Sequence, residues 1–321
     1  MKSLLASVLA VALGATGAAA QTYPTRPITI IAPTPPGGPP DTLARLLSDR
    51  AKGLGQPIVV ENVTGAGGTL GVARAARAAP DGHTLSIGHL NSHVISSLTY
   101  PGVADLVREL EPIVLLTTAP MIFVGRSGLP GGDVRELIAW LKANPDKGTF
   151  GSVGVGGPAR LWATHFQNST GVRFQFVPYR GAVLVVQDLL AGQIDFGMME
   201  ASNLAAQLRG DRLRFYAVLT KERWPVAPQI PTIEEAGGPP FTMPFWHGLW
   251  APKGTPKEIV AKLNAVVIDA LADPLTQARL AQTGHATFPR AQLTPEALGA
   301  HHKAEFEKWW PIIQAAGLKA E

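Results

Sequence analysis

The chain has 321 residues, of which 46% are hydrophobic and 16% charged, and it contains no cysteine. This length predicts about two domains with a substantial core, and the lack of cysteine excludes disulfides, thiolate metal ligands and cysteine nucleophiles. The 28 Lys and Arg residues against 24 Asp and Glu give a net charge of +4 without any long basic run, so nucleic-acid binding is not indicated.

The first twenty residues have the pattern of a secretory signal peptide. Lys2 supplies a positive start, residues 4–13 form a short apolar stretch, and the alanines at 18–20 suit cleavage before Gln21. The apolar stretch is too short to anchor the chain in a bilayer. The alternative interpretation of residues 1–20 is a helix buried in the protein core. We expect residues 1–20 to be removed on export to a bacterial periplasm, which leaves a soluble protein.

Short β-branched runs alternate with amphipathic segments in the first hundred residues. Strands are predicted at 28–32, 57–61 and 84–88, and helices at 41–54 and 71–79. Such alternation is typical of parallel strands joined by helices, and therefore of an α/β architecture.

The rest of the chain continues this pattern without a repeat or a tract of low complexity. Glycine and proline clusters at 125–132 and 237–240 interrupt it, and we interpret them as crossings between two lobes. The predicted strands are 112–117, 121–124, 149–153, 174–178, 194–199 and 213–219, and the predicted helices are 134–143, 161–170, 183–191, 257–272 and 295–316.

A loop rich in proline and glycine, residues 33–41, connects the first predicted strand to the first helix. Ligands of open α/β sheets bind beyond the carboxyl ends of the strands, where this loop is expected. Gly37 and Gly38 let backbone N–H groups approach a ligand, and the helix start at Asp41 adds positive partial charge. An ordinary connector would have the same local sequence, so both interpretations stay open.

A second glycine-rich loop, residues 151–157, repeats this arrangement in the second half. It matches a dinucleotide fingerprint poorly, because Pro158 intrudes and no acidic residue ends the next strand at Val177. A second anion-binding loop is the simpler interpretation. Arg160 could hold a carboxylate through two parallel hydrogen bonds, with a solvated arginine as the alternative. The glycine turn at 65–68 is predicted to serve packing.

The sequence shows no residues arranged for catalysis or metal binding. Neither a G-x-S-x-G elbow nor a phosphate-binding P-loop occurs, and the histidines lack H-E-x-x-H or comparable spacing. Catalytic residues, metal ligands and cofactors are therefore not predicted. Solvated positions are predicted for Glu234, Glu235, Glu305 and Glu307, and core or lobe-packing positions for Trp246, Trp250, Trp309 and Trp310.

A series of short motifs occurs along the chain in a specific order. They are YPTRPI at 23–28, PPGG at 35–38 with Asp41 and the pair Ala44–Arg45, VEN at 60–62 with GAGG at 65–68, PDGHTL at 80–85, SVGVG at 152–156, PYRGA at 178–182, DLLAGQID at 188–195, PT at 231–232 with EAG at 235–237, and APKGTP at 251–256. This order closely resembles the Bug family, the periplasmic substrate-binding receptors of tripartite tricarboxylate transporters. The resemblance covers essentially the whole mature chain.

The resemblance implies a two-lobed periplasmic-binding-protein-like fold of type II, in which each lobe is a mixed sheet flanked by helices. One lobe is expected to comprise residues 21–124 and 241–321, and the other residues 125–240. The lobes are expected to close on a small carboxylate, either a di- or tricarboxylate or an aromatic carboxylate. The partners implied are membrane transporter subunits, and the chain itself is expected to be a monomer.

The resemblance also implies which loops bind the ligand. Departures from the family pattern, such as Thr34 for Phe, prolines at 39–40 and Glu200 for Asp, lie in these loops and leave the identity of the ligand open. Arg160, at a position where His is common, is expected to pair with a distal carboxylate. The candidate ligand-binding residues are Thr34, Pro36, Gly37, Gly38, Asp41, Asn91, Ser92, His93, Ser152, Gly156, Gly157, Arg160, Tyr179, Gly181, Ala182 and Glu200.

Two other functions stay open at this point. A ligand sensor for a signalling partner would have the same fold and the same site. A secreted enzyme could use Asp41, His93 or Glu200 as a base, but it would need a paired acid and base in the cleft and measurable turnover.

Overall fold

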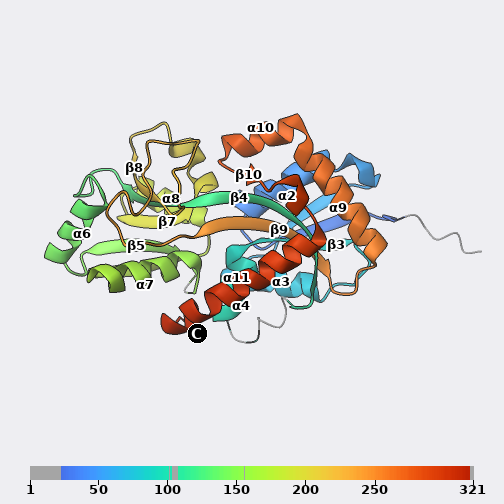
Figure 1. Cartoon of the computed structure of the whole chain (residues 1–321), viewed down its shortest axis with the longest axis horizontal. Coiled ribbons are helices and arrows are strands. Elements are labelled where there is room, and N and C mark those ends of the chain that lie inside the picture. The colour runs from blue at the N-terminus through green and yellow to red at the C-terminus, as the bar shows by residue number, and fades with distance from the viewer. Residues whose placement is uncertain (1–22, 101, 103–107, 155, 319–321) are drawn as a thin grey trace, which may run out of the picture.

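The computed structural model describes residues 23–100, 102, 108–154 and 156–318, so the predicted signal peptide lies outside the described residues. The strands follow one another in the order β2-β1-β3-β9-β4-β7-β5-β6, and β8 and β10 also pair with β4 (Figure 1). Among the described residues, no helix combines the length and the apolar character needed to cross a membrane.

The first sheet combines the first three strands of the chain with the late strand β9 and the first part of β4. β1 (Ile28–Ala32) lies in parallel between β2 (Ile58–Asn62) and β3 (Thr84–His89). β9 (Pro244–Pro252) is antiparallel to β3. The first part of β4 (Leu110–Arg126) pairs with β9, so residues far apart in sequence form the middle of this sheet.

The second sheet is built on the remaining part of β4. From Met121 onward β4 is antiparallel to β7 (Phe196–Glu200) and to β8 (Leu213–Val218). β5 (Gly148–Val153) is parallel to β7 and to β6 (Phe174–Tyr179). This mixed pairing is the α/β arrangement expected from the sequence.

β4 is a single strand, although its sequence predicts two. Pro120 separates the predicted parts, and it lies opposite Pro244 of β9 at the point where β4 exchanges β9 for β7 and β8. A proline donates no ladder hydrogen bond, so it is tolerated where the pairing changes. Val124, the expected end of the first lobe, therefore lies inside a strand that both sheets share.

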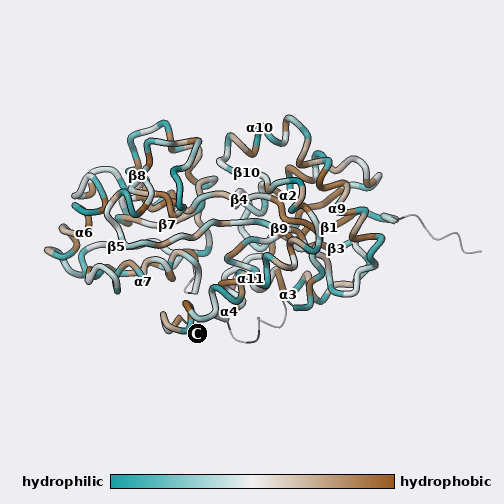
Figure 2. The backbone as a smooth tube through the Cα atoms, in the orientation of Figure 1, coloured by the Kyte–Doolittle hydropathy of each residue, from teal (hydrophilic) through white to brown (hydrophobic). Residues whose placement is uncertain are grey.

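Helices cover both faces of each sheet. On the first sheet, α2 (Pro39–Arg50) and α9 (Lys257–Ala272) contact one another and the strands, and their buried side chains belong to one apolar cluster. α3 (Thr69–Ala76) and α11 (Pro295–Ala315) also contact strands of this sheet, but their buried side chains belong to a second apolar cluster. On the second sheet, α6 (Val134–Ala143) and α7 (Pro158–Thr170) add buried side chains to the same cluster as α3 and α11. The buried side chains of α8 (Ala182–Leu190) belong to a third apolar cluster. Hydrophobic segments gather around β1, β3 and α9, and hydrophilic ones lie in outer loops (Figure 2).

Four helices begin earlier than the sequence predicts, and two of them begin at prolines. α2 starts at Pro39 and α7 at Pro158, with Gly38 and Gly157 as N-cap residues. A proline suits the first helical turn, because its missing N–H would have no partner there and its φ angle is already helical. These prolines are therefore helical residues rather than parts of the connecting loops.

Other elements are absent from the sequence-based predictions. They include β9, a π-helical turn at Asn91–Ile95 followed by α4 (Ser96–Thr99), and α10 (Pro274–Gln282). β9 contains Gly248 and is flanked by prolines, which obscures its strand character. The chain after β3 therefore continues as a buried helical segment and not as an open loop.

The C-terminal helix corrects two predictions about polar and aromatic residues. Glu305 is buried and accepts hydrogen bonds from the indole nitrogens of Trp246 (3.1 Å) and Trp309 (2.9 Å), so it is not solvated. Trp250 is buried as expected, but Trp310 is 49% exposed.

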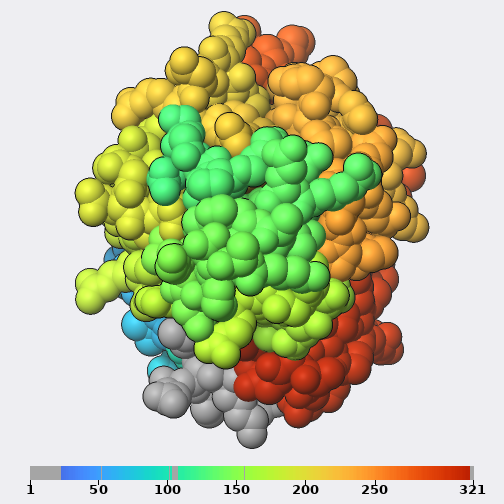
Figure 3. All heavy atoms as spheres, turned by 90° about the vertical axis from the view of Figure 1, so that its left-hand side faces the viewer, coloured from blue at the N-terminus to red at the C-terminus, as the bar shows by residue number. Residues whose placement is uncertain are grey.

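The end of α11 lies beside α7, with which it lines a shallow groove, and both are visible from the second-sheet end of the molecule (Figure 3).

Candidate functional site

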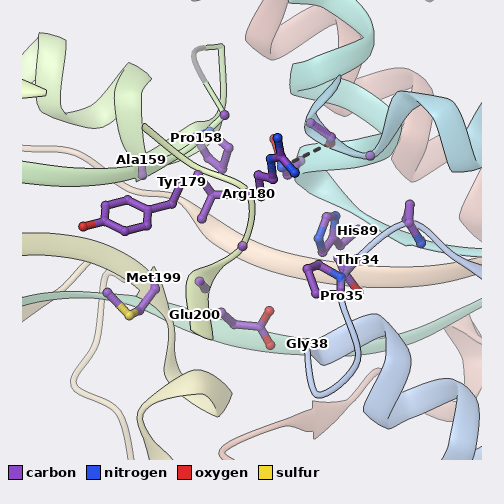
Figure 4. A pocket seen from close by; sticks show the side chains of 18 of the residues that line it. Thr34, Pro35, Gly38, His89, Pro158, Ala159, Tyr179, Arg180, Met199 and Glu200 are labelled. Carbon is purple, nitrogen blue, oxygen red and sulfur yellow. Dashed lines mark hydrogen bonds between the residues drawn. The ribbon is translucent and has the colours of Figure 1, made fainter. Parts of the chain in front are cut away.

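A cavity of about 640 Å³ lies between loops that follow strands of both sheets (Figure 4). The first sheet contributes the loop after β1, Thr64 with the glycine turn at 65–68, and His89 at the end of β3. The second sheet contributes the starts of α7 and α8 and the end of β7. The cavity therefore lies at the carboxyl ends of parallel strands, where open α/β sheets bind ligands.

The structure brings part of the predicted site together. The candidates that line the cavity are Thr34, Gly38, Asn91, Tyr179, Gly181, Ala182 and Glu200. The candidates that lie outside its lining are Pro36, Gly37, Asp41, Ser92, His93, Ser152, Gly156, Gly157 and Arg160.

Ser92 and His93 are buried behind the cavity wall. The hydroxyl of Ser92 lies 2.9 Å from Nδ1 of His93 and 3.0 Å from Nδ1 of His89. The His93 ring stacks on Trp250 at a centroid distance of 4.2 Å, in space that Gly88 leaves free by lacking a Cβ. The π-helical turn thus directs these two side chains into the core instead of toward a ligand.

Asp41 lies in the first turn of α2 and holds this turn in place through its hydrogen bonds. Its carboxylate accepts hydrogen bonds from the Gly37 N–H (2.9 Å), from Asn62 (2.9 Å) and from the Arg45 guanidinium. Burial alone would raise the pKa of Asp41, but hydrogen bonds from Arg45, Gly37 and Asn62 outweigh it and leave that pKa below its usual value. Asp41 positions the loop after β1 rather than facing the cavity.

The loop before α7 holds several candidates in structural roles. Gly157 caps the helix, and a Cβ on Gly156 would lie 2.5 Å from the Thr99 hydroxyl. Ser152 is buried in β5. The Arg160 guanidinium lies 3.3 Å from the centroid of the Phe176 ring, so a cation–π contact engages it. Burial lowers the pKa of Arg160.

Three helices begin at the cavity. Gly38 and Pro39 of α2, Pro158 and Ala159 of α7, and residues 181–183 at the start of α8 all line it. No acidic side chain lies in the first turn of α7 or α8. Helix N-termini carry positive partial charge and unpaired N–H groups, so their convergence favours an anionic ligand.

Arg180 is a cavity residue that is missing from the sequence candidates. It precedes α8, its side chain is exposed, and it makes no ion pair among the described residues (Figure 4). Its position within the PYRGA motif is the only sequence signal that pointed to it. An unpaired guanidinium at this rim can pair with a carboxylate.

The glycine turn at 65–68 also lines the cavity, although its sequence predicts a packing role. Gly65, Ala66, Gly67 and Gly68 all have positive φ angles. A Cβ on Gly67 would lie 2.3 Å from the Ser96 hydroxyl, so the turn is held close to the buried helical segment after β3. The turn therefore serves both packing and the shape of the cavity.

Tyr179 borders the cavity, but its hydroxyl is engaged elsewhere. That hydroxyl donates a hydrogen bond to the Asp188 carboxylate of α8, and the ring points away from His89, Thr34 and Pro35 (Figure 4). Burial together with Asp188 raises the pKa of Tyr179 to about 12. Thr34, in contrast, has a buried hydroxyl at the opposite wall that finds no hydrogen-bond partner in the described part of the chain.

Glu200 contributes a buried carboxylate to the wall. Its two oxygens lie 2.8 Å from Nε2 of His285 and 3.4 Å from Nε2 of His247. Burial would raise the pKa of Glu200, but the two histidines outweigh it and hold that pKa well below its usual range. Burial, together with His247, lowers the pKa of the neighbouring His89 to about 3.

Comparison with known proteins identifies the family. The model of the tripartite tricarboxylate transporter family receptor matches residues 43–318. MatC from Rhodopseudomonas palustris, solved with bound malate, is 36% identical and superimposes with a TM-score of 0.85, covering 91% of this chain and 100% of that one. The periplasmic binding protein BugD is 34% identical with a TM-score of 0.86, covering 93% and 100% of the two chains.

A further solved structure has the same fold. Rpa4515 of R. palustris, solved with adipate, is 29% identical with a TM-score of 0.86 and covers 93% of this chain and 100% of that chain. The α/β periplasmic-binding-protein fold and the family predicted from the motif order are thus confirmed. This chain belongs to the receptor family of the tripartite tricarboxylate transporters.

Proposed function

We propose that this protein captures a small di- or tricarboxylate, or an aromatic carboxylate, between two lobes and delivers it to the membrane subunits of a transporter. Its relatives MatC and Rpa4515 were solved with malate and adipate, both dicarboxylates. The observation that carries the proposal is the convergence of three helix N-termini and Arg180 on one cavity. Its volume of about 640 Å³ is typical of small-molecule pockets.

The ligand carboxylates are assigned to two walls of the cavity. At one wall, the first N–H groups of α8, those of Ala182 and Val183, precede the helical hydrogen-bond ladder and lie next to Arg180, so they would hold one carboxylate. At the other wall, the Thr34 hydroxyl has no partner within the described residues and would donate to a second polar group of the ligand. Proline at the first positions of α2 and α7 removes donors there, which makes α8 the main anion-binding helix start.

The two lobes of the proposal correspond to residues 21–124 with 241–321, and to residues 125–240. β4 and β9 run along the junction, and these strands are where the hinge is expected. Closure about a hinge would exclude water from the bound anion and strengthen its hydrogen bonds. The closed form would be the one that the membrane subunits recognise.

We also propose that residues 1–20 direct export and are removed before Gln21. Mass spectrometry of the protein recovered from a periplasmic fraction tests this, because the N-terminal peptide should begin at Gln21. Recovery of the uncleaved chain from the membrane fraction alone would contradict it. Gel filtration of the same material should give a monomer.

The test of function is a thermal-shift screen of the purified protein against malate, succinate, adipate, citrate and phthalate, with the fully amidated acids as neutral controls. A ligand at about 100 times its Kd adds about 2.7 kcal/mol to the free energy of unfolding. We expect one class of acid to raise Tm by several degrees and its amide to have no effect. The proposal is wrong if, after unfolding and refolding to remove any bound ligand, no acid in the panel raises Tm.

A further inference from the structure

Three buried polar side chains meet where the two sheets join. Glu200 ends β7, His247 lies in β9, and His285 precedes β10 (Ala286–Thr287). One ligand atom from each of them lies within 4.8 Å of the other two. The side chains of Glu200, His247 and His285 are 3%, 0% and 1% exposed, so water does not solvate them from the surface.

Threonine hydroxyls contact the outer ring nitrogen of each histidine. Thr117 Oγ1 lies 3.2 Å from Nδ1 of His247, and Thr283 Oγ1 lies 2.9 Å from Nδ1 of His285. Because the Thr283 hydroxyl already donates to the Leu280 carbonyl (3.0 Å), it accepts the Nδ1 proton of His285. In the neutral ring this leaves the lone pair of Nε2 directed at the Glu200 carboxylate. Histidines that bind metals are held by their second nitrogen in this way.

Oε1 of Glu200 accepts a hydrogen bond from the Ser202 hydroxyl (3.0 Å), but three inner atoms of the cluster lack hydrogen-bond partners among the described residues. These atoms are Oε2 of Glu200 and Nε2 of both His247 and His285. Buried polar atoms are nearly always satisfied, and a buried carboxylate without compensation is costly. A proton on His285 would satisfy one contact, at 2.8 Å, but it would leave Oε2 and His247 unpaired. A single cation between the three residues would satisfy all of them.

We propose that Glu200, His247 and His285 bind one divalent transition-metal ion, with zinc as the best fit. Two imidazoles and one carboxylate form a ligand set typical of zinc sites that keep a fourth position open, whereas Ca²⁺ and Mg²⁺ prefer oxygen ligands. The 3.4 Å between His247 Nε2 and Glu200 Oε2 agrees with the spacing of about 3.4 Å between tetrahedral ligands at about 2.1 Å from zinc. The 2.8 Å between His285 Nε2 and Glu200 Oε1 is shorter than this spacing and has to lengthen when the ion binds.

The site joins segments of both sheets. Glu200 pairs with Met121 in the second sheet, whereas His247 belongs to the first sheet and lies opposite His89. Glu200 also lines the ligand cavity, so the ion lies directly behind its wall and offsets the negative charge that Glu200 would present to an anion. The metal is thus a structural link between the sheets and an electrostatic component of the cavity.

The test measures metal binding and does not depend on the carboxylate ligand. The purified protein is stripped with a chelator and titrated at neutral pH with ZnCl₂ against a chromophoric chelator. We expect one equivalent of zinc per chain, and we expect Glu200→Gln and His285→Gln each to weaken binding by more than about 100-fold. Circular dichroism verifies that both variants fold. Titration of the wild-type protein with Co²⁺ should give the intense visible bands of a four-coordinate nitrogen- and oxygen-ligated ion.

The matched control is His165→Ala, which removes a half-buried histidine of α7 outside the cluster. This variant should bind zinc like the wild-type protein. The proposal is overturned if Glu200→Gln binds zinc as tightly as the wild-type protein, or if His165→Ala loses the bound equivalent. A weak, octahedral Co²⁺ spectrum in the wild-type protein would also overturn it, and the cluster would then be a proton-linked carboxylate and histidine pair.

Discussion

Arg180 stands at the start of α8 with an exposed side chain and without an ion-pair partner among the described residues. Hydrogen bonds between a guanidinium and a carboxylate contribute about 1.5–3 kcal/mol. We therefore expect Arg180→Ala to weaken the affinity for the bound acid by at least about 10-fold. Isothermal titration calorimetry with the acid found in the screen measures the change.

Arg209→Ala is the control for that prediction. Arg209 is also exposed, but it does not line the cavity, so its replacement should leave the affinity unchanged. Equal losses in both variants would indicate a general effect of net charge, and an unchanged affinity in Arg180→Ala would remove Arg180 from the ligand contacts.

Gly88 illustrates how one residue supports the buried segment behind the cavity. A Cβ at this position would lie 1.9 Å from the His93 ring. Because that ring is stacked on Trp250 and cannot withdraw without disrupting the core, Gly88→Ala should lower the free energy of unfolding by at least about 2 kcal/mol. Urea denaturation followed by tryptophan fluorescence measures this loss.

Gly299 provides the comparison within the same protein. It lies in α11, and an added Cβ would meet only Pro112, at an ordinary distance of 3.5 Å. Gly299→Ala should therefore stabilise the protein by about 0.5–1 kcal/mol, the usual gain in a helix. Destabilisation of both variants by similar amounts would contradict the packing argument at Gly88.

At the scale of elements, α2 depends on the carboxylate that organises its first turn. Asp41→Asn replaces a buried acceptor of several hydrogen bonds by an amide, so it should cost about 1–3 kcal/mol at pH 7. The folded pKa of Asp41 is lowered, so the stabilisation is present above the unfolded value of about 3.9 and is lost as the pH falls below it. The difference between the wild-type protein and the variant should therefore shrink as the pH falls below about 4.

Urea unfolding of both proteins across this pH range gives the measurement. Asp49→Asn, an exchange on the same helix without the Asp41 contacts, should show no comparable dependence on pH. A constant difference between wild-type protein and Asp41→Asn down to the lowest pH would show that the Asp41 charge does not stabilise α2.

Many elements were predictable because their signals are local. The strand at 28–32 and the helices at 134–143 and 257–272 have the bounds that periodicity predicts. β9 was not predictable, since its partners β3 and β4 are distant in sequence and its glycine and prolines resemble a loop. Tertiary pairing decided its conformation, as it did for the continuous β4.

The site was predictable as a set of loops but only partly as a set of side chains. Motif order pointed to the loops before α2, α7 and α8, all of which line the cavity. It placed Ser92 and His93 in the same site, because a π-helical turn that turns them inward has no sequence signature. The Glu200, His247 and His285 cluster was invisible for a related reason, since its members lie on separate elements and share no spacing motif.

For the whole molecule, the cavity between the two sheets predicts a change of shape on binding. If the proposed lobes close about β4 and β9, a saturating carboxylate should lower the radius of gyration measured by small-angle X-ray scattering. The fully amidated form of the same acid should leave it unchanged. An unchanged radius at a ligand concentration that calorimetry shows to be saturating would mean that the cavity binds its ligand without closure.

The placement of β9 has a consequence for the order in which the protein is synthesised. The first sheet receives the strand between β3 and β4 only from residues 244–252, and α11 then packs on β4 from residues 295–315. A nascent chain that ends before these segments lacks the middle of its first sheet and part of the cover of its core. The first sheet therefore stays incomplete until nearly all of the polypeptide has emerged, and this delay suits a protein that is proposed to cross a membrane before it folds.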